Sequence, residues 1–261
     1  MLATHRDIVD RMTDRYQAQP DVVALIVIGS VARGDASSHS DVDAVVILKD
    51  EAFARRYPSG LSPLTAEELS WFAGDPLNAK PWPTRFLRAA AERGPEPTRF
   101  AFVDALTIFS RDPEVDALLP TIPRYPEHER AEKLASFAAQ LPIHLSYLEL
   151  GDYSENPYIL TDTSHELALF GGRLLLAHNR LLYPGRKQFW QQLERAREIP
   201  ERFFWLLQWL LRQPCIPSAH AFREAVLGFQ DWPKPAEGQG ARYLRDRDEA
   251  WLWRPAALAE S

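Results

Sequence analysis

Two aspartates one residue apart are the side chains in this sequence best placed to do chemistry. Asp41 and Asp43 stand at the start of an apolar run that ends at Leu48. On an extended chain, residues two apart point to the same face, and neighbouring carboxylates repel each other unless a cation lies between them. Mg²⁺ suits such a pair, because it binds carboxylates jointly with substrate phosphates. An Asp-x-Asp pair is most often a solvated turn, but a carboxylate that enters a buried run is costly unless it is paired, so Asp43 favours a metal site.

A glycine and a serine upstream form the second feature. Gly29 and Ser30 directly follow the apolar run 22–28. Glycine lets the chain turn sharply and lets its backbone approach a ligand, while serine adds a hydroxyl group. If a helix begins near Val31, its unpaired N–H groups offer a site for a phosphate. A Gly-Ser pair after a strand is common, so its significance depends on the aspartates that follow it.

Asp104 is the candidate for a third carboxylate. It lies inside the apolar run Phe100–Phe109, which we predict to be a strand. If that strand lies beside the one after Asp43, three carboxylates could hold two ions about 3.5–4 Å apart, one activating an attacking oxygen and one stabilising a leaving pyrophosphate. The alternative is that Asp104 lies on the exposed face of an edge strand. Arg33 and Asp35 are expected to form a salt bridge that orders their loop.

The elements that must position these residues follow from hydrophobic spacing. Apolar residues spaced four apart over 8–16 predict a first helix. The runs 22–28 and 42–48 are apolar and rich in β-branched residues, which is typical of strands covered on both faces. A helix is expected after Thr65 as its N-cap, and a further short helix over 86–93 within a Pro-rich loop.

A cluster of prolines after Asp112 interrupts any long element, and we place a domain boundary there, giving domains 1–120 and 121–261. Beyond it, apolar residues recur at helical spacing over 134–148, 167–182 and 203–211, so the second domain is predicted to be mostly α-helical.

Two further expectations concern the end of the chain. Ser218 is expected to cap another helix. The tail after Asp231 is rich in Pro, Gly and charge, and we expect Trp232, Trp251 and Trp253 to anchor it.

Composition limits the classes of partner. The net charge of −6 disfavours a protein that coats nucleic acid through clustered Lys and Arg. The single cysteine, Cys215, fits a reducing cytosol and is interpreted as buried filler. Neither a signal peptide nor an apolar run long enough for a membrane helix is present in the sequence, so a cytoplasmic location is expected.

The order of these features resembles a known family. A strand, Gly29-Ser30, an Arg-Gly-Asp, the Ser-Asp-x-Asp that ends at Asp43 and then a second strand are similar to the signature of DNA polymerase β-type nucleotidyltransferases, most of all the small bacterial aminoglycoside and lincosamide nucleotidyltransferases. The resemblance implies that Gly29 and Ser30 contact a triphosphate and that Asp41 and Asp43 bind catalytic metal. Asp104 would be the third carboxylate, as a metal ligand or as the acceptor of the attacking hydroxyl's proton.

The same resemblance implies a fold and an activity. The expected fold is α+β, with a mixed sheet and helices on one side of it, followed by a helical domain that closes the active-site cleft. The expected cofactor is Mg²⁺, as two ions, and the expected reaction moves AMP from ATP to a hydroxyl group of a small molecule, an aminoglycoside-like antibiotic being the first guess. The alternatives are a regulatory or antitoxin-type enzyme that modifies a protein or tRNA, and a non-catalytic nucleotide-binding protein. Monomer and homodimer both stay open.

A weaker resemblance concerns the stretch 174–187 of the second half. Similar segments follow the catalytic domain in bacterial members of the superfamily, which implies that Lys187 meets the nucleotide phosphates. The alternative is that Lys187 only solvates a helix start. Glu149 and Glu166 are second-domain carboxylates that could act as general base, and the sequence favours neither.

Overall fold

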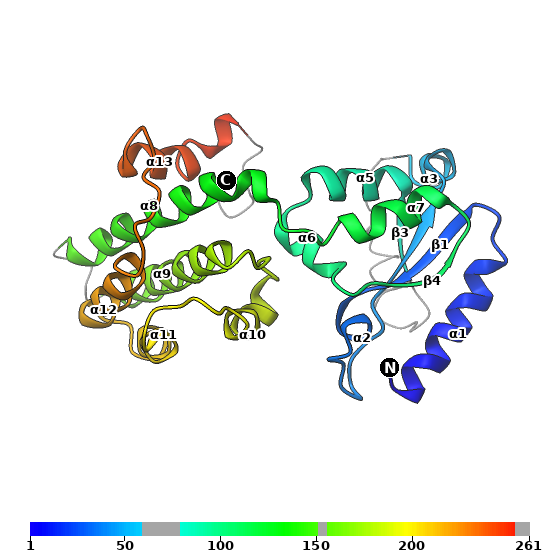
Figure 1. Cartoon of the computed structure of the whole chain (residues 1–261), viewed down its shortest axis with the longest axis horizontal. Helices are drawn as coiled ribbons and strands as arrows, with labels where there is room; N and C mark the ends of the chain where they lie inside the picture. The colour runs from blue at the N-terminus through cyan, green and yellow to red at the C-terminus, as the bar shows by residue number, and fades with distance from the viewer. Residues whose placement is uncertain (59–78, 151–155, 254–261) are drawn as a thin grey trace. The chain divides into compact units, whose positions relative to one another are not determined.

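The computed structural model describes residues 1–58, 79–150 and 156–253, and it divides into two compact units, Met1–Arg124 and Tyr125–Ser261 (Figure 1). The boundary lies four residues beyond the predicted one. Ile122 explains the difference, because its side chain is fully buried in the core of the first unit. In addition, Arg99 donates hydrogen bonds to the carbonyl oxygens of Ile122 and Arg124, at 3.1 and 3.5 Å.

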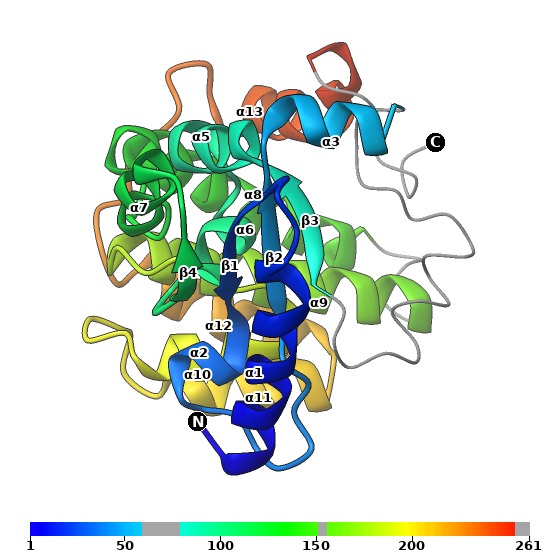
Figure 2. The same cartoon turned by 90° about the vertical axis from the view of Figure 1, so that its right-hand side faces the viewer.

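The first unit contains a four-stranded mixed sheet, so the predicted α+β class is confirmed. The strands run side by side in the order β3-β2-β1-β4 (Figure 2). β1 pairs antiparallel with β2 and with β4, whereas β2 and β3 are parallel. The strands are β1 (Val22–Val27), β2 (Ala44–Leu48), β3 (Lys80–Pro83) and β4 (Leu106–Ser110).

Helices cover both faces of this sheet, which corrects the expectation that they lie on one side. Alternate residues of β1 and β2 enter two separate cores. One core includes residues of α1 and α3, and the other includes residues of α5 and α7. The helices of the unit are α1 (Ala3–Gln17), α2 (Gly29–Arg33), α3 (Asp50–Arg56), α5 (Thr84–Arg93), α6 (Glu96–Ala101) and α7 (Pro113–Leu118), followed by the short 3-10 helix η1 (Leu119–Thr121).

The two predicted central strands are confirmed as β1 and β2. Every residue of both is buried, as expected for strands covered on both faces. The edge strands were predicted less well. β3 lies in the segment that we expected to be Pro-rich loop, and its prolines, Pro81 and Pro83, are tolerated because the strand lies at the edge of the sheet. The predicted strand Phe100–Phe109 is wrong in its first half, where α6 ends at Ala101 and a turn precedes β4.

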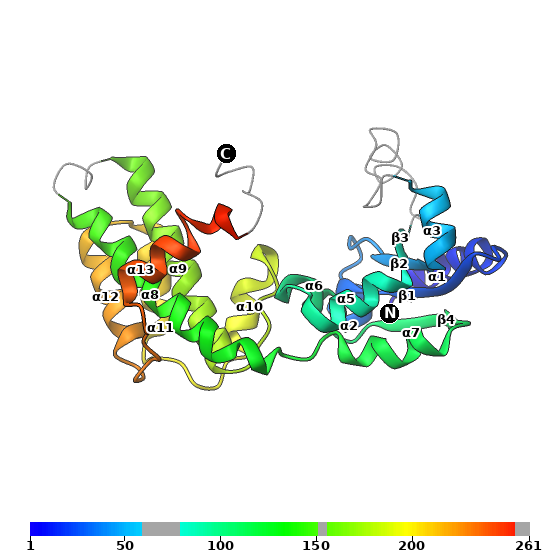
Figure 3. The same ribbon diagram turned by 90° about the horizontal axis from the view of Figure 1, so that it is seen from above.

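The second unit is helical, as predicted. Its main core lies among α8, α9, α11 and α12, and α13 lies along α8 (Figure 3). The helices are α8 (Arg130–Glu149), α9 (Pro157–His178), α10 (Phe189–Glu194), α11 (Phe203–Arg212), α12 (Ile216–Leu227) and α13 (Gln239–Asp246), with 3-10 helices η2 (Glu127–Glu129), η4 (Arg186–Gln188) and η5 (Ala250–Leu252).

The predicted ends of this unit need correction. α12 begins at Ile216 with Cys215 as its N-cap, and Ser218 completes the capping box from inside the helix. Trp232 is buried and anchors its segment, but Trp251 and Trp253 are exposed and do not. The helix expected after Thr65 falls outside the described residues. Of the helices that the structure describes, not one has the length and apolar character needed to cross a membrane.

Candidate active site

The turn after β1 brings the Gly-Ser pair against the second aspartate. Ile28 donates its backbone N–H to the carbonyl oxygen of Asp43 at 2.8 Å, so the two segments run side by side just beyond the paired strands. Gly29 then turns the chain into α2 with a φ of +72°. The backbone angle favours glycine here, and a β-carbon at this position would lie 2.7 Å from Asp43 Oδ2, so a larger residue would have to displace that carboxylate.

The two aspartates point the same way, and both are exposed. Val42, between them, is 9% exposed and belongs to the core under the sheet. Asp41 and Asp43 are on the opposite side of this extended segment, where their side chains reach solvent. The expectation that Asp43 is buried is therefore wrong, because β2 and its apolar run begin one residue later, at Ala44.

A buried histidine fixes the loop that leads to the aspartates. His5 of α1 is 2% exposed, and its Nε2 lies 3.0 Å from the carbonyl oxygen of Ser40. Ser40 also closes a turn with Ser37, whose N–H donates to Ser40 Oγ at 2.9 Å. We did not identify His5 from the sequence, because it lies 35 residues from Ser40 and no spacing pattern links the two.

The predicted salt bridge between Arg33 and Asp35 is confirmed, with Arg33 Nε 3.3 Å from Asp35 Oδ2. The Arg33 side chain is 6% exposed, and its guanidinium lies over the ring of Phe100, 5.1 Å from the centroid. Both residues thus order the loop after α2.

Asp104 is not in a strand, in contrast to the prediction. It is an exposed residue with a φ of +55° in the turn between α6 and β4. β4 pairs with β1 and not with β2, so the strand that follows Asp104 does not lie beside the one that follows Asp43. Among the described residues, no three His, Cys, Asp or Glu side chains are grouped so as to hold a metal ion. The structure therefore does not bring Asp104 together with Asp41 and Asp43.

The residues that are brought together nevertheless fit one hard cation. Mg²⁺ keeps most of its coordination positions for water and substrate phosphates, and it needs only one or two carboxylates from the protein. Asp41 and Asp43 supply two exposed carboxylates on one face, and the absence of a side chain at Gly29 leaves room for the carboxylate of Asp43.

Lys187 belongs to the second unit, in the 3-10 helix η4, and its side chain is exposed. Its contact with nucleotide phosphates stays a prediction.

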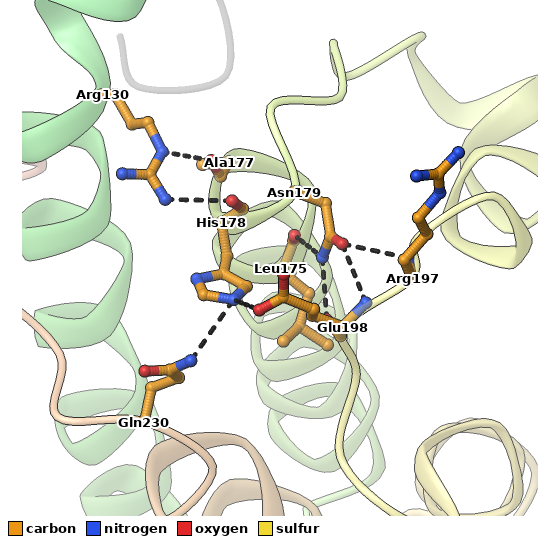
Figure 4. Close-up of polar contacts among 8 residues, drawn as sticks. All are labelled: Arg130, Leu175, Ala177, His178, Asn179, Arg197, Glu198 and Gln230. Carbon is orange, nitrogen blue, oxygen red and sulfur yellow. Dashed lines mark hydrogen bonds and ion pairs between the residues drawn. The ribbon is translucent and has the colours of Figure 1, made fainter.

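Asn179, in the same stretch, has a structural role. Its Nδ2 donates to the carbonyl oxygens of Leu175 and Glu198, both at 2.8 Å, and its Oδ1 accepts from the N–H groups of Arg197 and Glu198 (Figure 4). These four hydrogen bonds of the Asn179 side chain go to the end of α9 and to the segment after α10, so the side chain holds the two together. His178 adds a contact of 2.9 Å from Nε2 to Glu198 Oε2.

The two second-unit carboxylates that were considered as general bases both have cationic or histidine neighbours. Glu149 Oε1 lies 2.9 Å from His220 Nε2. Glu166 Oε2 lies 3.2 Å from a guanidinium nitrogen of Arg247. Neither arrangement favours one of them as a base.

Of the comparisons with known proteins, the match to a family model bears on the first unit. No curated protein shows significant sequence similarity to the chain. A solved structure described as a nucleotidyltransferase-like protein from Exiguobacterium sibiricum 255-15 aligns with 15% identity and a TM-score of 0.45, covering 98% of this chain and 83% of that chain. The family model described as nucleotidyltransferase domain matches residues 5–93, a range that includes Gly29, Ser30, Asp41 and Asp43 and ends before Asp104. Residues 5–93 are thus similar to a nucleotidyltransferase domain, and nucleotidyl transfer is the class of chemistry that this similarity supports.

Proposed function

We propose that this protein is a Mg²⁺-dependent nucleotidyltransferase that transfers AMP from ATP to a hydroxyl group of a small molecule. The observation that carries the proposal is the close approach of Gly29 to Asp43. It joins a turn suited to a phosphate with a carboxylate suited to a cation, and both lie within the residues that match the nucleotidyltransferase domain.

Each residue of the site has a role in this reaction. Gly29 lets the triphosphate approach the backbone, and Ser30 offers a hydroxyl and an N–H at the start of α2. Asp41 and Asp43 hold the cation that the triphosphate carries with it. The chemistry that bound Mg²⁺ supplies is neutralisation of the phosphate charge as pyrophosphate leaves. The protein otherwise acts by positioning the α-phosphorus for in-line attack.

The acceptor is proposed from charge. A net charge of −6 attracts cationic compounds, so an aminoglycoside-like sugar is the first acceptor to test.

Nucleotide binding tests the donor half of the proposal. Calorimetry with ATP, GTP, CTP and UTP, each with Mg²⁺, should show binding that is tightest for ATP and disappears when Mg²⁺ is removed. Replacing both aspartates, Asp41→Asn with Asp43→Asn, should weaken this binding at least about 100-fold, because a carboxylate–metal interaction contributes several kcal/mol. Asp7→Asn, an exposed carboxylate on α1, is the matched control and should bind like the wild type.

Two outcomes would count against the proposal. Folded wild-type protein that binds none of the four nucleotides with Mg²⁺ would rule out the transferase. If ATP binds but mass spectrometry finds no adenylylated product in an aminoglycoside and lincosamide panel, the drug acceptor is wrong, and a mass gain of AMP on a protein or tRNA would identify the other acceptor class.

A further inference from the structure

A cavity of about 610 Å³ lies within the helical unit, in a part of the molecule that the proposed reaction does not use. Its walls come from α8, α9, α13 and the 3-10 helix η5. This volume is within the range of about 300–1,000 Å³ that is typical of small-molecule sites.

The charge of the walls is predominantly positive. Arg173 of α9 and Arg245 and Arg247 at the end of α13 line the cavity, against one carboxylate, that of Asp246. Asp246 is already engaged, because its Oδ2 accepts a hydrogen bond from Ser136 and a charged one from Arg242 Nε. An anion is therefore the ligand that these walls favour.

Two of these arginines make ion pairs that use only part of their hydrogen-bonding capacity. Arg247 lies 3.2 Å from Glu166, and Arg245 lies 3.8 Å from Glu237. A guanidinium has five N–H donors in a planar fork, which suits the oxygens of a phosphate. Arg245 is also 54% exposed, so a ligand can reach it from solvent.

The remaining walls suit a flat ring with polar edges. Phe137 and Phe170 are buried and form an apolar part of the cavity, with the guanidinium of Arg173 over the ring of Phe137, 4.3 Å from its centroid. The exposed ring of Trp253 lies at the margin of the cavity. Gln140 also lines the cavity. It is 1% exposed, and its Oε1 has no hydrogen-bond partner among the residues that the structure describes. A buried acceptor without a partner destabilises the fold, so a ligand donor that reaches it would remove that cost.

We propose that this cavity binds a nucleoside monophosphate. The phosphate would lie among the arginines, the base against the exposed ring of Trp253, and an amino or imino group of the base would donate to Gln140 Oε1. Glutamine amides and aromatic rings recognise bases in this way, and arginines recognise phosphates. This site is separate from Asp41 and Asp43, and it uses no metal ion.

Binding of AMP, GMP, CMP and UMP to the full chain in EDTA tests the proposal. At least one monophosphate should bind, and the matching nucleoside and inorganic phosphate should each bind at least about tenfold more weakly, because each supplies only half of the contacts. The Asp41→Asn, Asp43→Asn variant should bind the monophosphate as the wild type does, so failure here and failure of the proposed transferase are distinguishable.

Two variants locate the site. Gln140→Leu should weaken binding about tenfold without lowering the melting temperature, because it removes a buried acceptor that has no partner. Arg245→Gln should weaken it by a similar factor, while Arg212→Gln, an exposed arginine on α11, should not.

Three results would overturn the proposal. One is that none of the four monophosphates binds in EDTA. Another is that Gln140→Leu and Arg245→Gln both bind as tightly as the wild type. The third is that inorganic phosphate or the nucleoside alone binds as tightly as the monophosphate.

Discussion

The carboxylate of Asp43 lies in the space that a side chain at position 29 would need, since a β-carbon on Gly29 would come within 2.7 Å of Asp43 Oδ2. The turn that could receive a phosphate and the carboxylate that could receive a cation are thus in direct contact. A side chain at position 29 would therefore have to displace the carboxylate of Asp43.

Replacing Gly29 with alanine should therefore damage the site more than the fold. Gly34 is the matched control, because it also has a left-handed φ, of +82°, but a β-carbon there would meet nothing within 4 Å. Both Gly→Ala variants should lose about 1 kcal/mol of stability from backbone strain. Only Gly29→Ala should also reduce Mg²⁺-ATP binding, by at least about tenfold. Equal nucleotide affinity in the two variants, measured by calorimetry, would show that Asp43 moves aside without consequence.

The predicted site included Asp104, and the observed site does not. Because it is exposed in the turn before β4 and is not grouped with the other two aspartates, Asp104→Asn should change the rate of nucleotidyl transfer less than about threefold. Asp43→Asn should lower that rate at least about 100-fold, because a bound metal ion contributes several kcal/mol. A steady-state assay decides the matter, and a large loss in Asp104→Asn would restore it as a catalytic carboxylate.

The side chain of Asn179 should contribute to the stability of the second unit. Asn179→Ala removes four hydrogen bonds, three to the backbone of Arg197 and Glu198 and one to the carbonyl oxygen of Leu175 in α9, which should cost about 2–4 kcal/mol in the free energy of unfolding. Asn156→Ala, at the N-cap of the same helix, should cost only about 1 kcal/mol. Urea unfolding measures both, and an Asn179 variant as stable as the Asn156 variant would contradict this role.

The pH dependence of stability should carry a contribution from His144. Burial, together with the charge of Arg247, lowers the pKa of His144 from 6.5 to about 4. Between these pH values His144 binds a proton in the unfolded chain but not in the folded protein. The free energy of unfolding therefore falls as the pH drops from about 6.5 to 4, by at most about 3 kcal/mol.

His144→Phe tests this contribution, because a phenyl ring can keep the stacking on Phe170, whose ring centroid lies 5.6 Å away. The variant should be about as stable as the wild type at pH 7 and should lose less stability on acidification. If urea unfolding of the two proteins shows the same loss between pH 6.5 and 4, His144 is not the titrating group.

Elements with strong local signals were predictable from the sequence. β1 and β2 are apolar throughout because both of their faces are covered, and α8, α9 and α11 show helical spacing of the apolar residues that pack in the helical core. The sequence did not predict that Gly29 meets Asp43, because this approach depends on the antiparallel pairing of β1 with β2.

The edges of the sheet were not predictable by the same reasoning. An edge strand needs few apolar residues and tolerates proline, so β3, which contains Pro81 and Pro83, has the sequence pattern of a loop. Within the run Phe100–Phe109, Phe100 and Phe102 are buried around the end of α6, whereas β4 is a half-exposed edge strand. A continuous apolar pattern does not show where a helix ends and a strand begins. The placement of Asp104 depended on a strand order that local spacing does not encode.

Arg99 holds the last residues of the first unit in place. Its buried guanidinium donates to five carbonyl oxygens, those of Ala91, Glu92, Gly94, Ile122 and Arg124. The last residues before Tyr125 are thereby held by contacts made inside the unit. A polypeptide that stops at Arg124 would keep the residues of both cores and these bonds, so the unit that includes residues 5–93, which are similar to a nucleotidyltransferase domain, contains the contacts that hold its own last residues.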